Sequence, residues 1–308
     1  MNQIKVEVKT SISENNLSEE LSFFRAKVRD LNQLVKVRLT LLVVFSSVVT
    51  YLTASQGAIN WMDVIILTAG GFLVTGAANG INQIIEKDYD KLMVRTANRP
   101  VATNRMSVVE ASIISLMMGL TGVILIAYYL NPVAGWLAFG ALLSYAFVYT
   151  PLKRISPISV FVGAFPGAIP TMLGWVAYSG KIDAPALILF AVQFFWQFPH
   201  FWSIAWILDD DYKRAGFKML PSTPGRDKGT AYQTLAFSLV LIPLGMLPAQ
   251  YGISGVTSGV VGALGGIMLS FYSYRLLKTC EIKDAKKLMF ASFVYLPLVQ
   301  LAYLFDKI

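Results

Sequence analysis

Nine long apolar runs dominate this sequence and limit what it can fold into. Each is close to the roughly 20 residues that a helix needs to cross the hydrocarbon core of a bilayer. Because lipid offers no hydrogen-bond partners to an open strand, runs of this length and uniformity are expected as helices. The predicted spans are 38–55, 62–86, 107–129, 132–150, 157–178, 185–208, 231–249, 254–274 and 288–305.

The composition supports a membrane protein with a single large domain. Of the 308 residues, 55% are hydrophobic and only 14% are charged, whereas charged residues make up about a quarter of a soluble globular chain. We therefore predict an all-α integral membrane protein, a bundle of nine transmembrane helices around a central cavity, formed by residues 38–308. Residues 1–37 are expected as a cytoplasmic tail followed by an interfacial segment.

The basic residues are distributed unequally between the two ends of the predicted helices. With nine spans, 24 of the 26 Lys and Arg residues fall on the N-terminal side of the membrane, and only Lys181 and Lys307 fall on the other. The positive-inside rule then places the N-terminus in the cytoplasm and the C-terminus outside. The net charge of +8 reflects this multi-pass topology, so it is not taken as a sign of nucleic-acid binding.

The scarcity of Cys and His restricts the metal chemistry that this chain can support. The sequence contains one Cys, Cys280, and one His, His200. A single Cys excludes a disulfide framework and a Cys-based zinc or iron–sulfur site, and a single His excludes a multi-histidine metal cage. A metal site in this chain would rely on oxygen ligands, which suit Mg²⁺.

Oxygen ligands recur where the second predicted span ends. Asn82, Glu86 and Asp90 are four residues apart, so successive side chains are rotated by only about 40° and share one face of a helix. Mg²⁺ usually binds proteins through one or two carboxylates and completes its shell with water and substrate phosphate. The alternative is that these residues are simply the solvated end of a helix that enters a cytoplasmic loop.

A second acidic cluster, Asp209–Asp211, ends the sixth span on the same side of the membrane. Three adjacent carboxylates repel one another, so nearby cations should compensate them. In a helical projection His200, Gln197 and Gln193 lie within about 40° of Asp211. The sixth span is therefore predicted to carry a polar stripe that faces a cavity or a partner helix rather than lipid.

Basic residues follow both acidic ends and flank other spans on the same side. Carboxylates able to hold a metal, surrounded by Arg and Lys, are typical of a diphosphate site, where the metal bridges phosphate oxygens and the cations neutralise the rest. For any single basic residue, the alternative is the positive-inside topology alone. The candidate diphosphate-binding residues are Arg38, Arg95, Arg99, Lys153 and Lys218.

The first acidic segment resembles the N-x3-D-x3-D motif of the UbiA-type intramembrane prenyltransferases. It reads Asn82-x3-Glu86-x3-Asp90, and Arg95 and an Asn-Arg-Pro turn at 98–100 follow it. Nine spans and a second acidic cluster are also typical of that family, so the resemblance covers the chain from about residue 30 onward. Glu86 stands where the family usually has Asp, which keeps the charge and lengthens the side chain by one methylene.

Three further stretches, 148–159, 163–175 and 196–221, resemble the branch of that family that attaches a farnesyl group to haem. This resemblance implies transfer of farnesyl from farnesyl diphosphate to the vinyl group of haem B, giving haem O, in the inner membrane of a bacterium. The implied partners are farnesyl diphosphate, haem B as a substrate rather than a cofactor, and the lipid bilayer. Terminal-oxidase assembly proteins are further candidates.

Together these features predict a mechanism in which a divalent cation, Mg²⁺, stabilises the departing diphosphate so that the allylic C–O bond can ionise. The candidate metal ligands are Asn82, Glu86, Asp90, Asp210 and Asp211, of which all but Asp210 are also the candidate catalytic residues. The candidate acceptor-binding residues are Trp196, Gln197 and His200. Two roles stay open for His200, namely ligation of haem iron and an interhelical hydrogen bond.

Two other functions are compatible with these residues. A prenyltransferase of the same type could act on an aromatic quinone precursor, since only the acceptor pocket would differ. A secondary transporter could use Glu86 and Asp211 as coupling groups, but transporters place their site near the bilayer midplane. Here the acidic groups cluster at one face of the membrane, which argues against transport.

Overall fold

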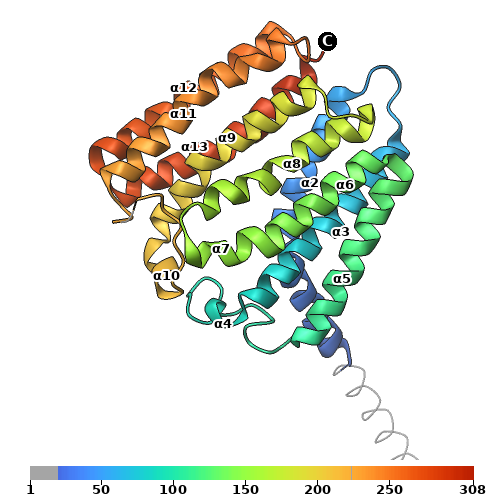
Figure 1. The fold of residues 1–308 in the computed structure, drawn as a ribbon, viewed down its shortest axis with the longest axis vertical. Helices are drawn as coiled ribbons and strands as arrows, with labels where there is room; N and C mark the ends of the chain where they lie inside the picture. The colour runs from blue at the N-terminus through green and yellow to red at the C-terminus, as the bar shows by residue number, and fades with distance from the viewer. Residues whose placement is uncertain (1–19, 223) are drawn as a thin grey trace, which may run out of the picture.

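The computed structural model describes residues 20–222 and 224–308, which form a bundle of helices (Figure 1). Within these residues, nine helices are long and apolar enough to cross a membrane. The expected all-α architecture with nine membrane helices is therefore confirmed. The tail expected at the N-terminus lies largely outside the described residues, apart from a helix over 20–35.

The spans are α2 (Val37–Ala54), α3 (Trp61–Ile85), α5 with the π-helix η1 (Val108–Leu125 and Ile126–Leu130), α6 with η2 and α7 (Pro132–Leu143, Ser144–Tyr149 and Thr150–Ile155), α8 (Ser159–Ser179), α9 (Ala184–Ile207), α11 (Lys228–Gln250), α12 (Val256–Thr279) and α13 (Ile282–Phe305). Two short helices, α4 (Lys87–Asp90) and α10 (Asp209–Arg214), follow α3 and α9. Figure 1 shows α4 and α10 at the same end of the bundle.

The last span packs against the first, which brings the two ends of the chain's membrane region together. Helix α2 contacts α3, α8 and α13, and α9 contacts α8, α11 and α13. Gln300 of α13 donates to Ser46 of α2 at 3.1 Å and to Gln193 of α9 at 3.2 Å. Such buried polar contacts between helices hold a membrane bundle together where the hydrophobic effect does not.

The α11–α12 hairpin packs closely because glycines lie at its interface. A Cβ placed on Gly262 would lie 2.5 Å from the carbonyl oxygen of Gly245, closer than any side chain tolerates. Small residues at such positions let two membrane helices approach backbone to backbone.

Most predicted spans agree with the helices to within about three residues; the fourth span continues to Ile155 rather than 150, and the largest difference is at the α12–α13 turn. Helix α12 continues to Thr279 and α13 begins at Ile282, whereas hydropathy placed these ends at 274 and 288. The difference arises because charged residues continue both helices beyond the apolar region. Asp284 is buried and accepts a hydrogen bond from Thr279 at 2.9 Å, and it pairs with Arg275 at 3.5 Å.

The helix over residues 20–35 lies at the same end as α4 and is docked against neighbouring segments (Figure 1). Lys27 pairs with Glu110 at the start of α5 at 2.8 Å. The buried Asp30 accepts from Arg105 at 3.0 Å. The chain then turns into α2 at Lys36, whose backbone is left-handed with φ 51° and ψ 57°.

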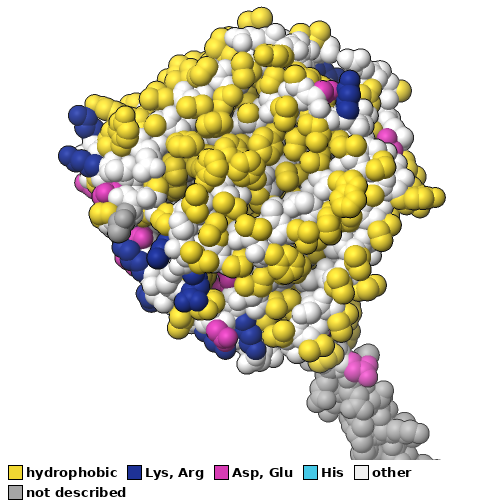
Figure 2. All heavy atoms as spheres, in the orientation of Figure 1, with side chains coloured by type: hydrophobic (Ala, Val, Ile, Leu, Met, Phe, Trp, Pro, Cys, Tyr) yellow, Lys and Arg dark blue, Asp and Glu magenta, His cyan; other side chains and the backbone are white. Residues whose placement is uncertain are grey.

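Charged and apolar surfaces are separated along the bundle. Figure 2 shows hydrophobic side chains over the broad middle of one face, and Lys and Arg side chains gathered toward the end that carries α4 and α10. A chain surrounded by hydrocarbon exposes apolar side chains along its spans and keeps its charges at the interfaces. The protein is therefore a multi-pass integral membrane protein.

Candidate active site

Asn82, Glu86 and Asp90 share one face at the end of α3, as their spacing predicts. Glu86 interrupts the helix between α3 and α4, yet its N–H bonds to the Asn82 carbonyl at 3.0 Å and the Asp90 N–H bonds to the Glu86 carbonyl at 2.8 Å. The helical spacing therefore continues across the interruption. All three side chains are buried, with at most 3% of each residue exposed.

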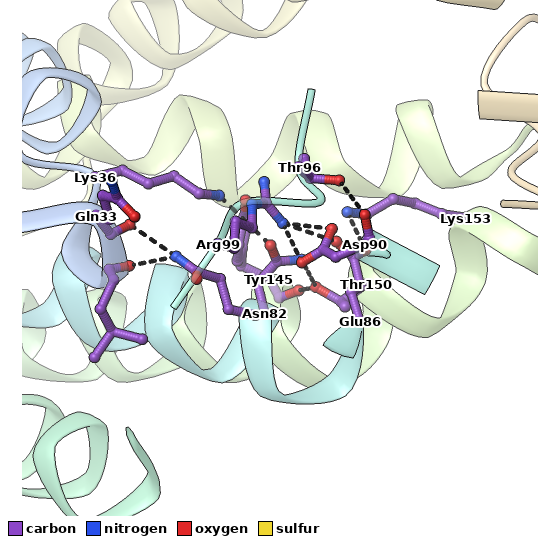
Figure 3. A network of polar contacts seen from close by, with 12 residues as sticks. Gln33, Lys36, Asn82, Glu86, Asp90, Thr96, Arg99, Tyr145, Thr150 and Lys153 are labelled. Atoms are coloured by element: carbon purple, nitrogen blue, oxygen red, sulfur yellow. Dashed lines mark hydrogen bonds and ion pairs between the residues drawn. The ribbon is translucent and has the colours of Figure 1, made fainter. Parts of the chain in front are cut away.

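Two cations contact the carboxylates of this cluster (Figure 3). Arg99 Nη1 donates to both oxygens of Asp90, at 2.8 and 2.7 Å, and lies 3.8 Å from Glu86 Oε2. Lys153 Nζ lies 2.5 Å from Glu86 Oε1. Arg99 comes from the loop after α4 and Lys153 from α7, so three segments contribute to one buried polar cluster.

Asn82 is oriented by two further contacts. Its Nδ2 donates to Thr150 Oγ1 at 3.1 Å, and its Oδ1 accepts from Lys36 Nζ at 3.5 Å. Thr150 in turn donates to the carbonyl of Tyr145 at 2.9 Å, five residues earlier, where the chain forms the π-helix η2. Short π-helical segments of this kind often occur at functional sites.

The cluster carries more positive than negative charge. Lys36, Arg99 and Lys153 face two carboxylates, those of Glu86 and Asp90. Burial lowers the pKa of the Lys36 amine well below its ordinary value, and the nearby charges of Arg99 and Lys153 lower it further. Burial also raises the pKa of Asp90, although Arg99 opposes this shift. An added anion would relieve the excess positive charge.

The second acidic end meets the first through the loop after α4. Asp211 Oδ1 accepts from the N–H of Val94 at 2.8 Å, and Oδ2 accepts from the N–H of Arg95 at 3.3 Å. Asp211 also pairs with Arg214. Burial raises the pKa of Asp211, but the hydrogen bonds from Arg214, Val94 and Arg95 outweigh it and hold the pKa below its ordinary value. Asp211 is thus an anion that ties the loop to α10.

The two acidic ends do not converge on one point in this structure. Asp210 is largely exposed and pairs with Arg226 at 3.0 Å, and Asp209 pairs with Lys213 at 2.7 Å. In the described part of the chain, no group of three or more His, Cys, Asp or Glu side chains is placed to hold a metal ion. Joint binding of one ion by both ends therefore stays a prediction.

The first cluster alone offers a donor set that fits Mg²⁺. Glu86 Oε1 is buried and lacks a hydrogen bond, because its close contact with Lys153 has the distance of an ion pair but not the alignment of a hydrogen bond. This oxygen therefore has an ion-pair partner but keeps a lone pair available for a metal ion. Mg²⁺ usually takes one or two protein carboxylates while substrate phosphate and water complete its shell, and the carboxylates of Glu86 and Asp90 with the Asn82 amide oxygen match this ligand chemistry.

The five candidate cations are placed differently. Arg99 and Lys153 lie in the cluster, and Arg95 is an exposed side chain whose charge contributes to the lowered pKa of Lys36. Arg38 is exposed and has no hydrogen bond or ion pair to the cluster within the described residues. Lys218 Nζ donates instead to the carbonyl of Ile155 at 3.3 Å.

Lys36 is the site residue that the sequence did not single out. Its sequence neighbours give no turn signal, since neither Gly nor Asn stands at the left-handed position. The turn directs Lys36 toward Asn82, as Figure 3 shows. Arg38, two residues later, remains outside the cluster.

The polar stripe of α9 faces partner helices. Gln193 and Gln197 donate to the carbonyls of Gly167 and Ala164 in α8, at 2.7 and 2.8 Å. His200 Nδ1 lies 2.9 Å from Ser292 Oγ of α13. The expectation of a stripe turned away from lipid agrees with these contacts, although α9 ends at Ile207 and Asp211 lies beyond the break.

The three candidate acceptor-binding residues do not form one group. Trp196 and His200 stack with ring centroids 4.5 Å apart, and Trp196 Nε1 donates to the Ser292 carbonyl at 2.9 Å. Gln197 is directed toward α8 instead. Trp196 and His200 therefore form a pair against α13, from which Gln197 is separate.

An apolar cavity of about 120 Å³ lies between α2, α3, α6 and α8. Asn79 and Tyr145 are among its lining residues, and they are close in sequence to Asn82 and Thr150 of the cluster. The remaining lining is mostly apolar or small, for example Val44, Gly71 and Leu173. The arrangement provides a charged region for an anion beside an apolar space for a hydrocarbon group.

Within the described residues, a buried cluster of oxygen donors and cations lies at one end of a bundle of nine membrane helices. The sequence model of the UbiA prenyltransferase family matches residues 42–294, and the chain belongs to this family. It is a prenyltransferase, which decides against the transporter alternative.

Curated relatives resemble the chain over almost their whole length. A "Protoheme IX farnesyltransferase" of Cytophaga hutchinsonii is 48% identical over 276 residues, covering 90% of this chain and 96% of the relative. A protein of the same name from Christiangramia forsetii is 45% identical and covers 90% of this chain and 93% of its own length.

The fold is also similar to that of solved structures. A UbiA homologue from Archaeoglobus fulgidus, bound to GPP and Mg²⁺, matches with a TM-score of 0.69 and covers 89% of this chain and 99% of its own. Its sequence identity is only 15%, so this similarity concerns the fold.

Proposed function

We propose that this protein transfers the farnesyl group of farnesyl diphosphate to a vinyl group of haem B and so forms haem O. The allylic C–O bond breaks, a bond forms between the farnesyl carbon and the terminal carbon of the vinyl group, and water adds to the other vinyl carbon as the hydroxyl group and releases its proton to the solvent. Diphosphate is the leaving group. The observation that carries the proposal is the buried Asn82–Glu86–Asp90 cluster with its excess of cations. The names of the relatives support the choice of farnesyl and haem.

The side chains of the cluster bind the diphosphate and balance its charge. Asn82, Glu86 and Asp90 would hold Mg²⁺, which supplies Lewis-acid stabilisation of the negative charge on the leaving group. A neighbour of the same fold that binds GPP together with Mg²⁺ supports this choice of ion. Without substrate, Arg99 pairs with Asp90 and Lys153 pairs with Glu86. When the substrate binds, both side chains would also donate hydrogen bonds to phosphate oxygens.

Asp211 acts as a positioning residue in this proposal. By accepting the N–H groups of Val94 and Arg95, it fixes the loop that also carries Arg99. The Arg95 charge then stays near Lys36, where it adds to the field that attracts diphosphate. Asp211 would thereby position the cations of the Asn82–Glu86–Asp90 cluster without contacting the reacting atoms itself.

The apolar cavity between α2, α3, α6 and α8 accepts part of the prenyl chain. Its volume of about 120 Å³ is below the roughly 300–1,000 Å³ of a typical ligand pocket. The cavity must therefore widen on binding, or the distal isoprene units lie beyond it. Its apolar lining also excludes water from the allylic carbon, which limits hydrolysis of the activated chain.

Haem B binds through His200 in this proposal. Ser292 Oγ donates to the Met289 carbonyl at 2.6 Å, so the same oxygen has to accept from His200 Nδ1–H at 2.9 Å. This hydrogen bond selects the tautomer with a lone pair on Nε2, the form that ligates a metal. In the described part of the chain, Nε2 has no hydrogen-bond partner.

The decisive experiment incubates the purified protein with haem B, labelled farnesyl diphosphate and Mg²⁺, followed by mass analysis of the haem product. We expect the mass of haem O, and no product when an aromatic acid replaces haem B. Prenylation of the aromatic acid but not of haem B would contradict the proposed acceptor.

Two variants test the site with the same chemical change. Asp90→Asn should reduce turnover by at least about 100-fold, since it removes a buried ligand whose charge balances Arg99. Asp88→Asn is the matched control, because Asp88 is exposed and pairs only with Lys91 in the described residues. Equal activity of both variants would exclude a role for the cluster.

A further inference from the structure

The helix over residues 20–35 presents an apolar stripe and a basic stripe side by side. Exposed apolar residues recur every three or four positions along it, which is one face of a helix. Arg25 and Arg29, four residues apart, lie beside that face and are also exposed. The apolar residues are Leu21, Phe24, Val28 and Leu31. This helix is not one of the nine membrane spans, so a position in the membrane interior does not account for its exposed apolar residues.

A groove of about 700 Å³ separates the basic stripe from the first turn of α2. We call it the headgroup groove. Its lining contains four cations and three apolar side chains but no carboxylate. The cations are Arg25, Arg29, Lys36 and Arg38, and the apolar residues are Val28, Val37 and Leu39. Such a lining matches an anionic group attached to hydrocarbon.

The guanidinium groups of the headgroup groove lack strong partners. Within the described residues, neither Arg25 nor Arg38 forms a hydrogen bond or an ion pair. Arg29 lies 3.8 Å from Asp30 Oδ1, but that oxygen already accepts from Arg105 at 3.0 Å.

Several other cations at the same end of the bundle are paired, so topology alone does not account for the groove. Lys91, Lys213 and Arg226 each lie within 3.0 Å of a carboxylate oxygen. The positive-inside rule requires basic residues at this end, but it does not require that they line one groove without a counter-charge.

We propose that the headgroup groove binds the phosphate of an anionic phospholipid from the adjacent leaflet, while the apolar stripe of helix 20–35 lies among the acyl chains. Guanidinium groups suit phosphate because they donate two parallel hydrogen bonds. Basic clusters directly beside a membrane span attract anionic lipids. The groove is distinct from the Asn82 cluster, with Lys36 as the residue that borders both.

A bound lipid would support the position of Lys36. The groove includes both sides of the left-handed turn at Lys36, from Arg29 on the helix to Arg38 on α2. A phosphate bound by Arg29 and Arg38 therefore holds the two arms of this turn together. The turn in turn directs the Lys36 amine to Asn82.

The test uses the full-length protein, purified in detergent and stripped of lipid, titrated with phosphatidylglycerol or phosphatidylcholine and observed by native mass spectrometry. Each basic residue near an anionic surface contributes about a fivefold gain in affinity. We expect Arg25→Gln combined with Arg29→Gln to weaken phosphatidylglycerol binding about 25-fold and to leave phosphatidylcholine binding unchanged.

The matched control combines Lys228→Gln with Lys286→Gln, two exposed cations at the same end of the bundle. It removes the same charge and should retain the preference for phosphatidylglycerol. Equal loss in the control would show a general surface effect and overturn the proposal, as would wild-type protein that binds both lipids alike. Thermal unfolding without lipid verifies that both variants are folded.

A last arm separates a lipid headgroup from free phosphate. Excess inorganic pyrophosphate should not displace phosphatidylglycerol, because the groove also binds the apolar part of the lipid. Displacement by pyrophosphate would assign the groove to soluble phosphate compounds and contradict the proposal.

Discussion

Lys36 combines two unfavourable features at one residue. Its backbone is left-handed, with φ 51° and ψ 57°, a region that costs a residue other than Gly roughly 1 kcal/mol or more. Burial lowers the pKa of its amine, and the neighbouring charges of Arg99 and Lys153 lower it further. Neither feature stabilises the free protein. The left-handed backbone and the lowered pKa are both explained if the structure holds the Lys36 amine in position to bind an anion. The diphosphate of the proposed substrate is such an anion.

We expect Lys36→Met to stabilise the fold while it weakens diphosphate binding. Because the pKa of Lys36 is lower in the folded than in the unfolded protein, the charged lysine destabilises the fold below its folded pKa. This penalty disappears as the pH rises to the unfolded value of about 10.4. The thermal midpoint of the variant should therefore exceed that of wild type at neutral pH, and the difference should shrink in alkaline buffer.

The same variant should bind Mg²⁺–pyrophosphate roughly ten- to a hundredfold more weakly, the range for loss of a hydrogen bond to a charged group. Isothermal titration calorimetry at neutral pH measures this affinity. Lys91→Met is the control, because Lys91 is exposed and pairs with Asp88 outside the cluster. Unchanged affinity of Lys36→Met for Mg²⁺–pyrophosphate would exclude a role of Lys36 in diphosphate binding.

His200 and Ser292 are expected to act together in haem binding. Replacing His200 by Ala removes the proposed ligand, so the Soret band of added haem B should no longer shift as it does with wild type. Ser292→Ala removes the acceptor that selects the tautomer and should weaken haem binding about tenfold. Ser270→Ala is the control, since Ser270 bonds only its own helix. A wild-type Soret shift in His200→Ala would remove the ligand role.

At the scale of elements, the parts that depend on local periodicity could be predicted and the parts that depend on distant contacts could not. Hydropathy placed the nine spans, and a spacing of four placed Asn82, Glu86 and Asp90 on one face. The loop after α4 is different. Its hydrogen bond to Asp211 joins residues that are 117 positions apart in the sequence. The local sequence does not indicate that the Asp211 carboxylate accepts from backbone N–H groups rather than binding a metal.

The docked loop gives a prediction about local stability. Asp211→Asn removes the charge that accepts the N–H groups of Val94 and Arg95. Hydrogen bonds to a charged group contribute about 1.5–3 kcal/mol, so exchange of these two amides with deuterium should accelerate roughly ten- to a hundredfold. The Michaelis constant for farnesyl diphosphate should rise with it, because Arg95 and Arg99 belong to this loop.

Asp210→Asn provides the comparison for the loop. Asp210 is exposed and pairs with Arg226, so its replacement should leave exchange at Val94 and Arg95 unchanged. Unaltered exchange in Asp211→Asn would mean that the loop is held by its own turns, and that Asp211 must act in another way.

At the scale of the whole molecule, the site, the headgroup groove and most of the described basic residues lie at one end of the bundle. On the face that Figure 2 shows, most of the Lys and Arg side chains lie toward this end. A diphosphate and a phospholipid headgroup both belong at the membrane interface, while farnesyl and haem belong among the spans. The orientation of the bundle therefore decides from which compartment diphosphate leaves and which leaflet supplies the lipid.

The single cysteine provides a direct measurement of that orientation. Cys280 lies in the turn between α12 and α13, at the basic end, and is partly exposed. If this end faces the cytoplasm, a membrane-impermeant maleimide should label Cys280 in inverted vesicles but not in right-side-out vesicles. Lys181→Cys in a Cys280→Ser background places the thiol in the exposed turn between α8 and α9, so its labelling should show the opposite pattern. Reversal of both results would place the diphosphate site on the opposite side of the membrane and contradict the cytoplasmic orientation that the positive-inside rule predicts.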